Sequence, residues 1–240
     1  VPAAGTGKHQ QPDGPGLRYI RFGEYLRDPL RSFTSLAPGP TQPRTGDPLE
    51  VIRHRRRPRP AGRRPRPGQP AAGAEERLHR LIDKIEEVSG WKNRKKNEGY
   101  GVAITECFAS TVGEILKVSK GANGKVKIDH VWAVMDCGWY VNPDTVKAQV
   151  EGSIIMALGA ATMHEVTFKD GLAEQQNFYE YELPRINDIP PIDVFIMENT
   201  ADAGGVGEPG LPPLAPALVN AVYDLTGKRI RKLPFSLNNV

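Results

Sequence analysis

GGVGEPGLPPLAPALVNAVYDLTGKRIRKLP, residues 204–234, carries the clearest pattern in the chain. Glycines on both sides of Glu208 allow the backbone to approach a ligand closely, and Pro209 keeps Glu208 out of the helix that follows. From Leu214 onward, apolar residues recur at helical spacing, and Gly227 can end that helix. The stretch therefore predicts a glycine-rich loop that presents a carboxylate just ahead of a buried helix.

Spacing alone leaves two interpretations of Glu208 open. A carboxylate held on a loop can act as a catalytic base if its pocket raises its pKa toward the working pH. A glutamate near the start of a helix can instead do no more than offset the helix dipole.

Two more helices are predicted upstream. In EERLHRLIDKIEEVSG, apolar residues stand at helical spacing from Glu75, and Gly90 can end the helix. Asn142 followed by Pro143 is typical of a helix start, and the buried stripe after it predicts a helix to about Thr162.

The remaining patterns predict strands, so the expected fold class is α+β. Residues 99–119 and 125–138 are expected as two strands joined by a turn at Lys120–Gly124. The second strand is expected to turn one set of side chains to a single face: Val126, Ile128, His130, Trp132 and Val134. Two short strands are expected around the turn at Lys169–Gly171, and a further strand from Ile192.

The first 74 residues have neither helical nor strand periodicity, so we expect an irregular segment before an ordered domain at 75–240. Residues 51–70 hold eight arginines and no acidic residue; without them the formal charge of +4 becomes −4. This run can be a nucleic-acid-binding tail, a solvated linker, or the product of a frame-shifted GC-rich reading frame.

Composition excludes several classes of site. Two cysteines, Cys107 and Cys137, cannot form a disulfide framework, a paired zinc motif or, by themselves, an iron-sulfur cluster. His130 and His164 have no partner at metal-ligand spacing, so no protein-held metal is expected. No apolar run is long enough to span a membrane, and no secretion signal stands in this chain, which leaves a cytoplasmic or a periplasmic location open.

Two motifs resemble one known family. GVGEPG with its proline-rich helix start, the A-x-x-N-A-V helix and TGKRIRKLP is similar to the closing signature of the large subunits of molybdenum hydroxylases, the xanthine dehydrogenase and aldehyde oxidase family. MDCGWYVNPDTVKAQVEGSIIMALGAAT, residues 135–162, resembles the D-x-G-x-x-x-N-P passage and the Q-x-E-G helix of the same subunits. The layout is most similar to the isoquinoline 1-oxidoreductase beta-subunit type. GDPLEVIR, residues 46–53, weakly resembles a helix found further upstream in these subunits.

The resemblance implies a C-terminal fragment of the molybdopterin-binding domain. The position that matches the catalytic base of the family is Glu208, and the loop residues Gly205, Val206 and Gly207 match its cofactor-binding loop. Gln149 matches a side chain that hydrogen-bonds the pterin, and Gly152 matches a glycine that permits close helix packing near it. From the residues alone, Gln149 can equally be an exposed glutamine with no ligand.

The implied activity is hydroxylation of an aldehyde or an N-heterocyclic carbon with water as the source of oxygen. The implied cofactor is molybdenum-molybdopterin, with the cytosine dinucleotide form as one option. Iron-sulfur clusters and any flavin would lie on partner subunits, because this chain lacks the cysteines. Two alternatives remain: a truncated, catalytically silent family fragment, and an arginine-rich nucleic-acid-binding protein, which the acidic remainder of the chain disfavours.

Overall fold

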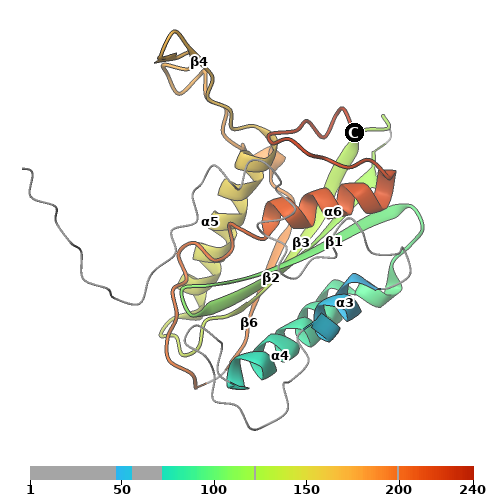
Figure 1. Cartoon of the computed structure of the whole chain (residues 1–240), viewed down its shortest axis with the longest axis vertical. Helices are drawn as coiled ribbons and strands as arrows, with labels where there is room; N and C mark the ends of the chain where they lie inside the picture. Colours follow the sequence, from blue (N-terminus) through green and yellow to red (C-terminus); the bar gives the residue numbers. More distant parts are fainter. Residues whose placement is uncertain (1–46, 56–71, 122, 199) are drawn as a thin grey trace, which may run out of the picture.

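The computed structural model describes residues 47–55, 72–121, 123–198 and 200–240. They form three layers (Figure 1), with a four-stranded sheet between two pairs of helices. One face of the sheet is covered by α3 (Pro48–Arg55) and α4 (Ala72–Ser89), and the other by α5 (Pro143–Thr162) and α6 (Leu214–Thr226). The expected α+β class is confirmed.

The sheet has the strand order β1-β2-β3-β6, with bounds Glu98–Cys107, Ser110–Lys120, Val126–Asp136 and Ile192–Ile196. The first three strands are antiparallel, whereas β3 and β6 are parallel and are connected through α5. The short strands β4 (Phe168–Lys169) and β5 (Leu172–Ala173) form a separate hairpin, which extends away from the sheet in Figure 1. Two 3-10 turns, η1 (Trp91–Asn93) and η2 (Ile186–Asp188), complete the described elements.

Most of the helix and strand predictions are confirmed. Helix α5 has the predicted bounds, and the Asn142 side chain caps it by accepting a hydrogen bond from Asp144 N at 2.9 Å. Helix α6 ends at Gly227, whose φ of 72° suits a glycine cap. Helix α4 ends before Gly90 as predicted, but it begins at Ala72, three residues earlier than expected.

The prediction of one long strand over residues 99–119 is wrong. The chain turns back at Phe108 and Ala109, whose φ values are 52° and 60°, and β1 pairs with β2 from Glu98↔Ser119 to Cys107↔Ser110. Two-residue hairpin turns of this kind usually contain Asn or Gly, and neither stands here. A strand of this length would exceed the usual three to ten residues, so length was the available signal.

The single-face alternation expected in β3 is also wrong. The pairing of β2 with β3 shifts between Lys117↔His130 and Val118↔Ile128, so that β3 carries one additional residue at this point. A shift by one residue moves every later side chain to the opposite face. Val126 and Ile128 therefore face α5 and α6, whereas Trp132 and Val134 face α4.

Helix α3 lies inside the segment that the sequence led us to expect as irregular. Leu49 and Ile52 are fully buried against α4, and the indole N–H of Trp91 donates to the Asp47 carboxylate at 2.8 Å. This helix coincides with GDPLEVIR, the stretch with the weak family resemblance. Most of the arginine run, and the question of its reading frame, lies outside the described residues.

Helix α6 packs directly on the edge strand β1. The Asp224 carboxylate accepts a hydrogen bond from Tyr100 N at 3.0 Å, and the Asn220 amide donates to Val102 O at 3.4 Å. These two side chains satisfy backbone groups on β1.

None of the helices in the described ranges is long and apolar enough to cross a membrane.

Candidate functional site

The loop that carries Glu208 runs along the end of β3. Gly204 N donates a hydrogen bond to Cys137 O at 2.8 Å. Gly138 has a φ of 71°, and a Cβ atom at this residue would lie 2.1 Å from Asp202 O. The two backbone segments are therefore too close for any side chain at Gly138, which fixes the path of the loop.

The turn between β1 and β2 contacts the same loop. Gly205 N donates to Phe108 O at 2.8 Å, and the Ser110 hydroxyl donates to Gly205 O at 2.7 Å. Both backbone groups of Gly205 are thus bonded to the turn, three residues before Glu208.

Gly210 anchors the other end of the loop on helix α5. A Cβ atom at Gly210 would lie 2.3 Å from Ser153 Oγ and 3.3 Å from Val150 O. The loop therefore lies against the turn of α5 that follows Gln149, and Glu208 is two residues from this contact. Two motifs that are more than fifty residues apart in the sequence meet here.

The residues predicted as a site are almost all exposed. The exposed members are Gln149, Gly152, Gly205, Gly207 and Glu208, whereas Val206 is half-buried against the larger core cluster. Apart from its chain neighbours and the backbone of its own helix, no described atom lies within 4 Å of a Cβ atom built at Gly152, so the close helix packing expected there stays a prediction. Gly210 is the glycine that permits close packing on α5.

An ion pair supports the end of β3 beside the loop. Arg77 of α4 donates twice to the Asp136 carboxylate, at 2.9 Å from Nε and 2.5 Å from its terminal nitrogen. Asp136 is buried and also accepts a hydrogen bond from Gly138 N at 3.2 Å. The hydrogen bond to Asp136 raises the pKa of Arg77, so this guanidinium stays charged. The pair orders the turn on which the Glu208 loop rests.

The end of β1 brings a thiol near the Glu208 carboxylate. Burial raises the pKa of the Cys107 thiol, and the negative charge of Glu208 raises it further. Cys107 therefore stays protonated at neutral pH, and it is not expected to act as a nucleophile.

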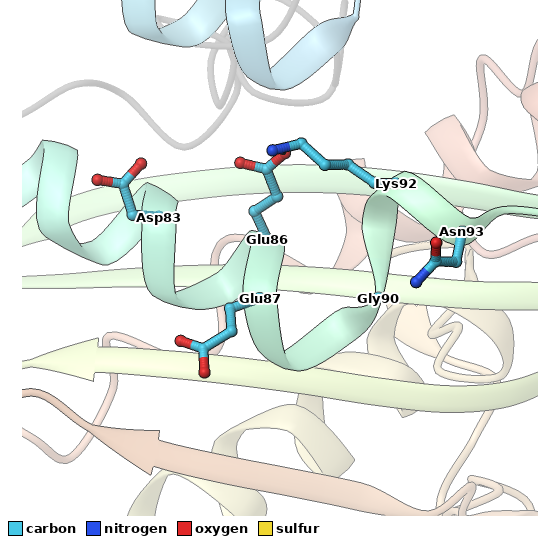
Figure 2. A pocket seen from close by; sticks show the side chains of 6 residues that line it. All are labelled: Asp83, Glu86, Glu87, Gly90, Lys92 and Asn93. Atoms are coloured by element: carbon cyan, nitrogen blue, oxygen red, sulfur yellow. The ribbon is translucent and has the colours of Figure 1, made fainter.

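A second hollow lies at the end of α4, on the other face of the sheet (Figure 2). It is lined by Asp83, Glu86, Glu87, Gly90, Lys92 and Asn93. Lys92 lies over Glu86 and pairs with it at 3.0 Å, and Lys84 pairs with Glu87 at 3.2 Å. These carboxylates already have cationic partners, so the hollow is a charged surface with no evident ligand chemistry.

The two histidines have structural neighbours. His130 Nε2 lies 2.8 Å from the Asp193 carboxylate and its ring stacks on Trp132, while His164 packs against Tyr181. Within the described part of the chain, no three His, Cys, Asp or Glu side chains are grouped so that they could hold a metal ion.

Comparison with known proteins finds similarity to molybdenum-binding subunits. Residues 85–190 match the family model of the molybdopterin cofactor-binding domain. Over 161 residues the chain is 32% identical to isoquinoline 1-oxidoreductase subunit beta of Brevundimonas diminuta. Over 151 residues it is 36% identical to aldehyde oxidoreductase molybdenum-binding subunit PaoC of Escherichia coli strain K12. Over these ranges the chain is similar to molybdenum hydroxylases.

The match to these relatives is partial in both directions. These two alignments cover 64% and 59% of this chain but only 20% and 21% of the relatives, so the chain spans about a fifth of their length. The crystal structure of quinoline 2-oxidoreductase from Pseudomonas putida 86 aligns with a TM-score of 0.49 at 25% identity, over 53% of this chain and 18% of that one. The matched range of the domain model includes Gln149 and Gly152 and ends before Glu208.

The exposed face of α5 and the Glu208 loop present polar groups that have no partner among the described residues. A glutamine amide can donate to and accept from the edge of a pterin ring, and the Gln149 amide has no hydrogen-bond partner among the described residues. The Gly207 backbone N–H is likewise unpaired there, and no atom lies within 4 Å of a Cβ atom built at Gly207. Polar donors with open space in front of them suit a ligand from outside this chain.

The sequence predicted the Glu208 loop and the α5 residues but not the residues whose contacts hold them in place. Ser110 and Phe108 were hidden inside the expected long strand, and the Arg77–Asp136 pair joins residues that no motif connects. An excessive strand length was the one signal that pointed to the first pair.

Proposed function

We propose that this chain is the part of a molybdenum hydroxylase that presents Glu208 as the catalytic base and contacts the pterin through Gln149 and the Gly205–Gly207 loop. The contact of Gly210 with Ser153 and Val150 on α5 carries this proposal. It holds the loop that carries Glu208 against the turn of α5 that follows Gln149, and the side chains of Glu208 and Gln149 are both exposed.

When bound, the cofactor supplies a two-electron oxidation that leaves an oxygen atom from water on the carbon of the substrate. The substrate class that we propose is an aldehyde or an N-heterocycle. This matches what the names of two relatives state, an aldehyde oxidoreductase and an isoquinoline 1-oxidoreductase.

Glu208 removes the proton from the attacking oxygen, because a carboxylate oxygen within hydrogen-bond reach can accept it. The loop contributes rigidity: Gly204, Gly205 and Gly210 are each held by backbone or steric contacts, which restricts where the carboxylate can move. The Gln149 amide orients the pterin edge.

Electrons leave through a partner in this proposal. The chain has two cysteines, of which Cys137 is buried and Cys107 half-buried, and four thiolates are usual for an iron-sulfur cluster. A small iron-sulfur subunit is therefore the expected partner.

Replacing Glu208 by Gln in the cofactor-loaded enzyme tests the proposal. The amide keeps the shape but accepts no proton, so turnover should fall by roughly 10²–10⁴-fold. Molybdenum content, measured by elemental analysis, should remain unchanged because the loop is held by its glycines.

Asp202→Asn is the matched control, since it neutralises another exposed carboxylate on the same connection and should leave turnover near the wild-type level. Turnover of Glu208→Gln close to wild type would rule Glu208 out as the base. A catalytically silent chain is favoured instead if wild-type protein carries cofactor but shows no turnover.

A further inference from the structure

The turn between β1 and β2 has an unfavourable backbone conformation. Phe108 and Ala109 both have positive φ values, 52° and 60°. For residues other than glycine, this left-handed conformation is unfavourable because the Cβ atom comes close to the following carbonyl oxygen. Such conformations persist only where surrounding contacts enforce them, and they concentrate at functional sites.

The contacts that enforce the turn come from the Glu208 loop. Phe108 O accepts the hydrogen bond from Gly205 N at 2.8 Å, and the Ser110 hydroxyl donates to Gly205 O at 2.7 Å. Ser110 is only 2% exposed, so water does not compete effectively for its hydroxyl.

Steric contacts leave the loop little freedom against the turn. A Cβ atom at Gly204 would lie 2.3 Å from Ser110 Oγ and 2.8 Å from the Ala109 carbonyl carbon. A Cβ atom at Gly205 would lie 2.8 Å from the Cβ atom of Phe108. Two consecutive glycines are thus in direct contact with the turn, and the loop cannot move toward it.

We propose that the turn Phe108–Ser110 is a positioning element for Glu208, and that the Ser110 hydroxyl holds the carboxylate in place through the Gly205 carbonyl. Glu208 follows Gly205 by three residues, so freedom of the backbone at Gly205 is transmitted to the Glu208 carboxylate. Displacement of a catalytic group by about 1 Å can cost a large factor in rate. The catalytic part of this inference rests on the proposed function, whereas the structural part can be measured without the cofactor.

Hydrogen-deuterium exchange of the full chain tests the structural part. In Ser110→Ala, peptides covering residues 204–211 should exchange about two- to tenfold faster, as expected for the loss of one hydrogen bond. Ser110→Cys keeps a side chain that fills the site but is a weak donor, so it should show the same increase. Ser119→Ala, on the same strand, is the matched control and should leave these peptides unchanged. Unchanged exchange in both Ser110 variants would overturn the inference.

Turnover of the cofactor-loaded enzyme tests the catalytic part. Ser110→Ala should lower kcat roughly tenfold with KM and molybdenum content unchanged, because only the placement of the base is affected. An unchanged kcat, or a fall explained by lost molybdenum, would overturn it. If the proposed function fails instead, Glu208→Gln retains turnover while the faster exchange in the Ser110 variants is still observed.

Discussion

Glu114 is a carboxyl group in the middle of the core. It lies in β2 between Ala103 of β1 and Ala133 of β3, and it is fully buried on the face covered by α5 and α6. Neither of its carboxylate oxygens has a hydrogen-bond partner among the residues that the structure describes. Burial raises the pKa of Glu114 well above its usual value, so the side chain is neutral at mildly acidic pH.

This residue predicts a pH dependence of stability. Because the pKa of Glu114 is higher in the folded than in the unfolded chain, the folded chain binds more protons between those two values. The resulting contribution to stability is fully present below the pKa of a glutamate in the unfolded chain, about 4.3. It is lost as the pH rises toward the pKa of Glu114 in the folded chain. Between pH 5 and pH 7, the free energy of unfolding measured by chemical denaturation should therefore fall less for Glu114→Gln than for wild type.

Glu114→Met, which removes the buried unpaired carboxyl, should raise the free energy of unfolding at pH 7 by roughly 1–3 kcal/mol. Glu87→Gln serves as a control because Glu87 is exposed. Its free energy of unfolding should show the same pH dependence as that of wild type. Identical pH slopes for wild type and Glu114→Gln would show that the carboxyl has another partner.

At the scale of elements, the docking of α6 on β1 depends on Gly101. A Cβ atom there would lie 2.0 Å from Ala217 O and 2.3 Å from Ala221 N, both backbone atoms that cannot move separately from the helix. Gly101→Ala should therefore destabilise the chain by about 3 kcal/mol or more, measured by thermal or urea unfolding.

Gly73→Ala is the matched control, since Gly73 is exposed in α4 with no atom within 4 Å of a Cβ atom. It should be neutral or stabilising by up to about 1 kcal/mol. Equal effects of the two substitutions would mean that α6 does not pack on β1 as described.

The elements that sequence predicted well have strong local signals. Helix α5 has Asn142 and Pro143 at its start and a continuous buried stripe, so its bounds could be stated correctly. The turn at Phe108 and the shift in β3 have no such signal, because tertiary contacts impose them on residues with other preferences. The positions of those residues in three dimensions were needed to find them.

For the whole molecule, the α+β class and the resemblance to molybdenum hydroxylases could be derived from sequence, whereas α3 and the division into β1 and β2 could not. The meeting of the Glu208 loop with α5 could not, since no pattern predicts that Gly210 lies against Ser153. The close packing expected at Gly152 stays a prediction, because that residue faces open space in the described chain. The central claim is that this open face of α5, beside the Glu208 loop, receives the pterin.

The most direct test is the molybdenum and pterin content of purified protein from a host that makes the cofactor, compared between wild type and Gly152→Leu. Leucine is a good helix former, and a Cβ atom at Gly152 has open space around it, so the fold should be unaffected while the face is obstructed. Gly73→Leu, on the opposite layer, is the matched control. We predict cofactor in wild type and in Gly73→Leu and a large loss in Gly152→Leu at an unchanged melting temperature. Equal cofactor content in Gly152→Leu and wild type, or none in wild type, would contradict the claim.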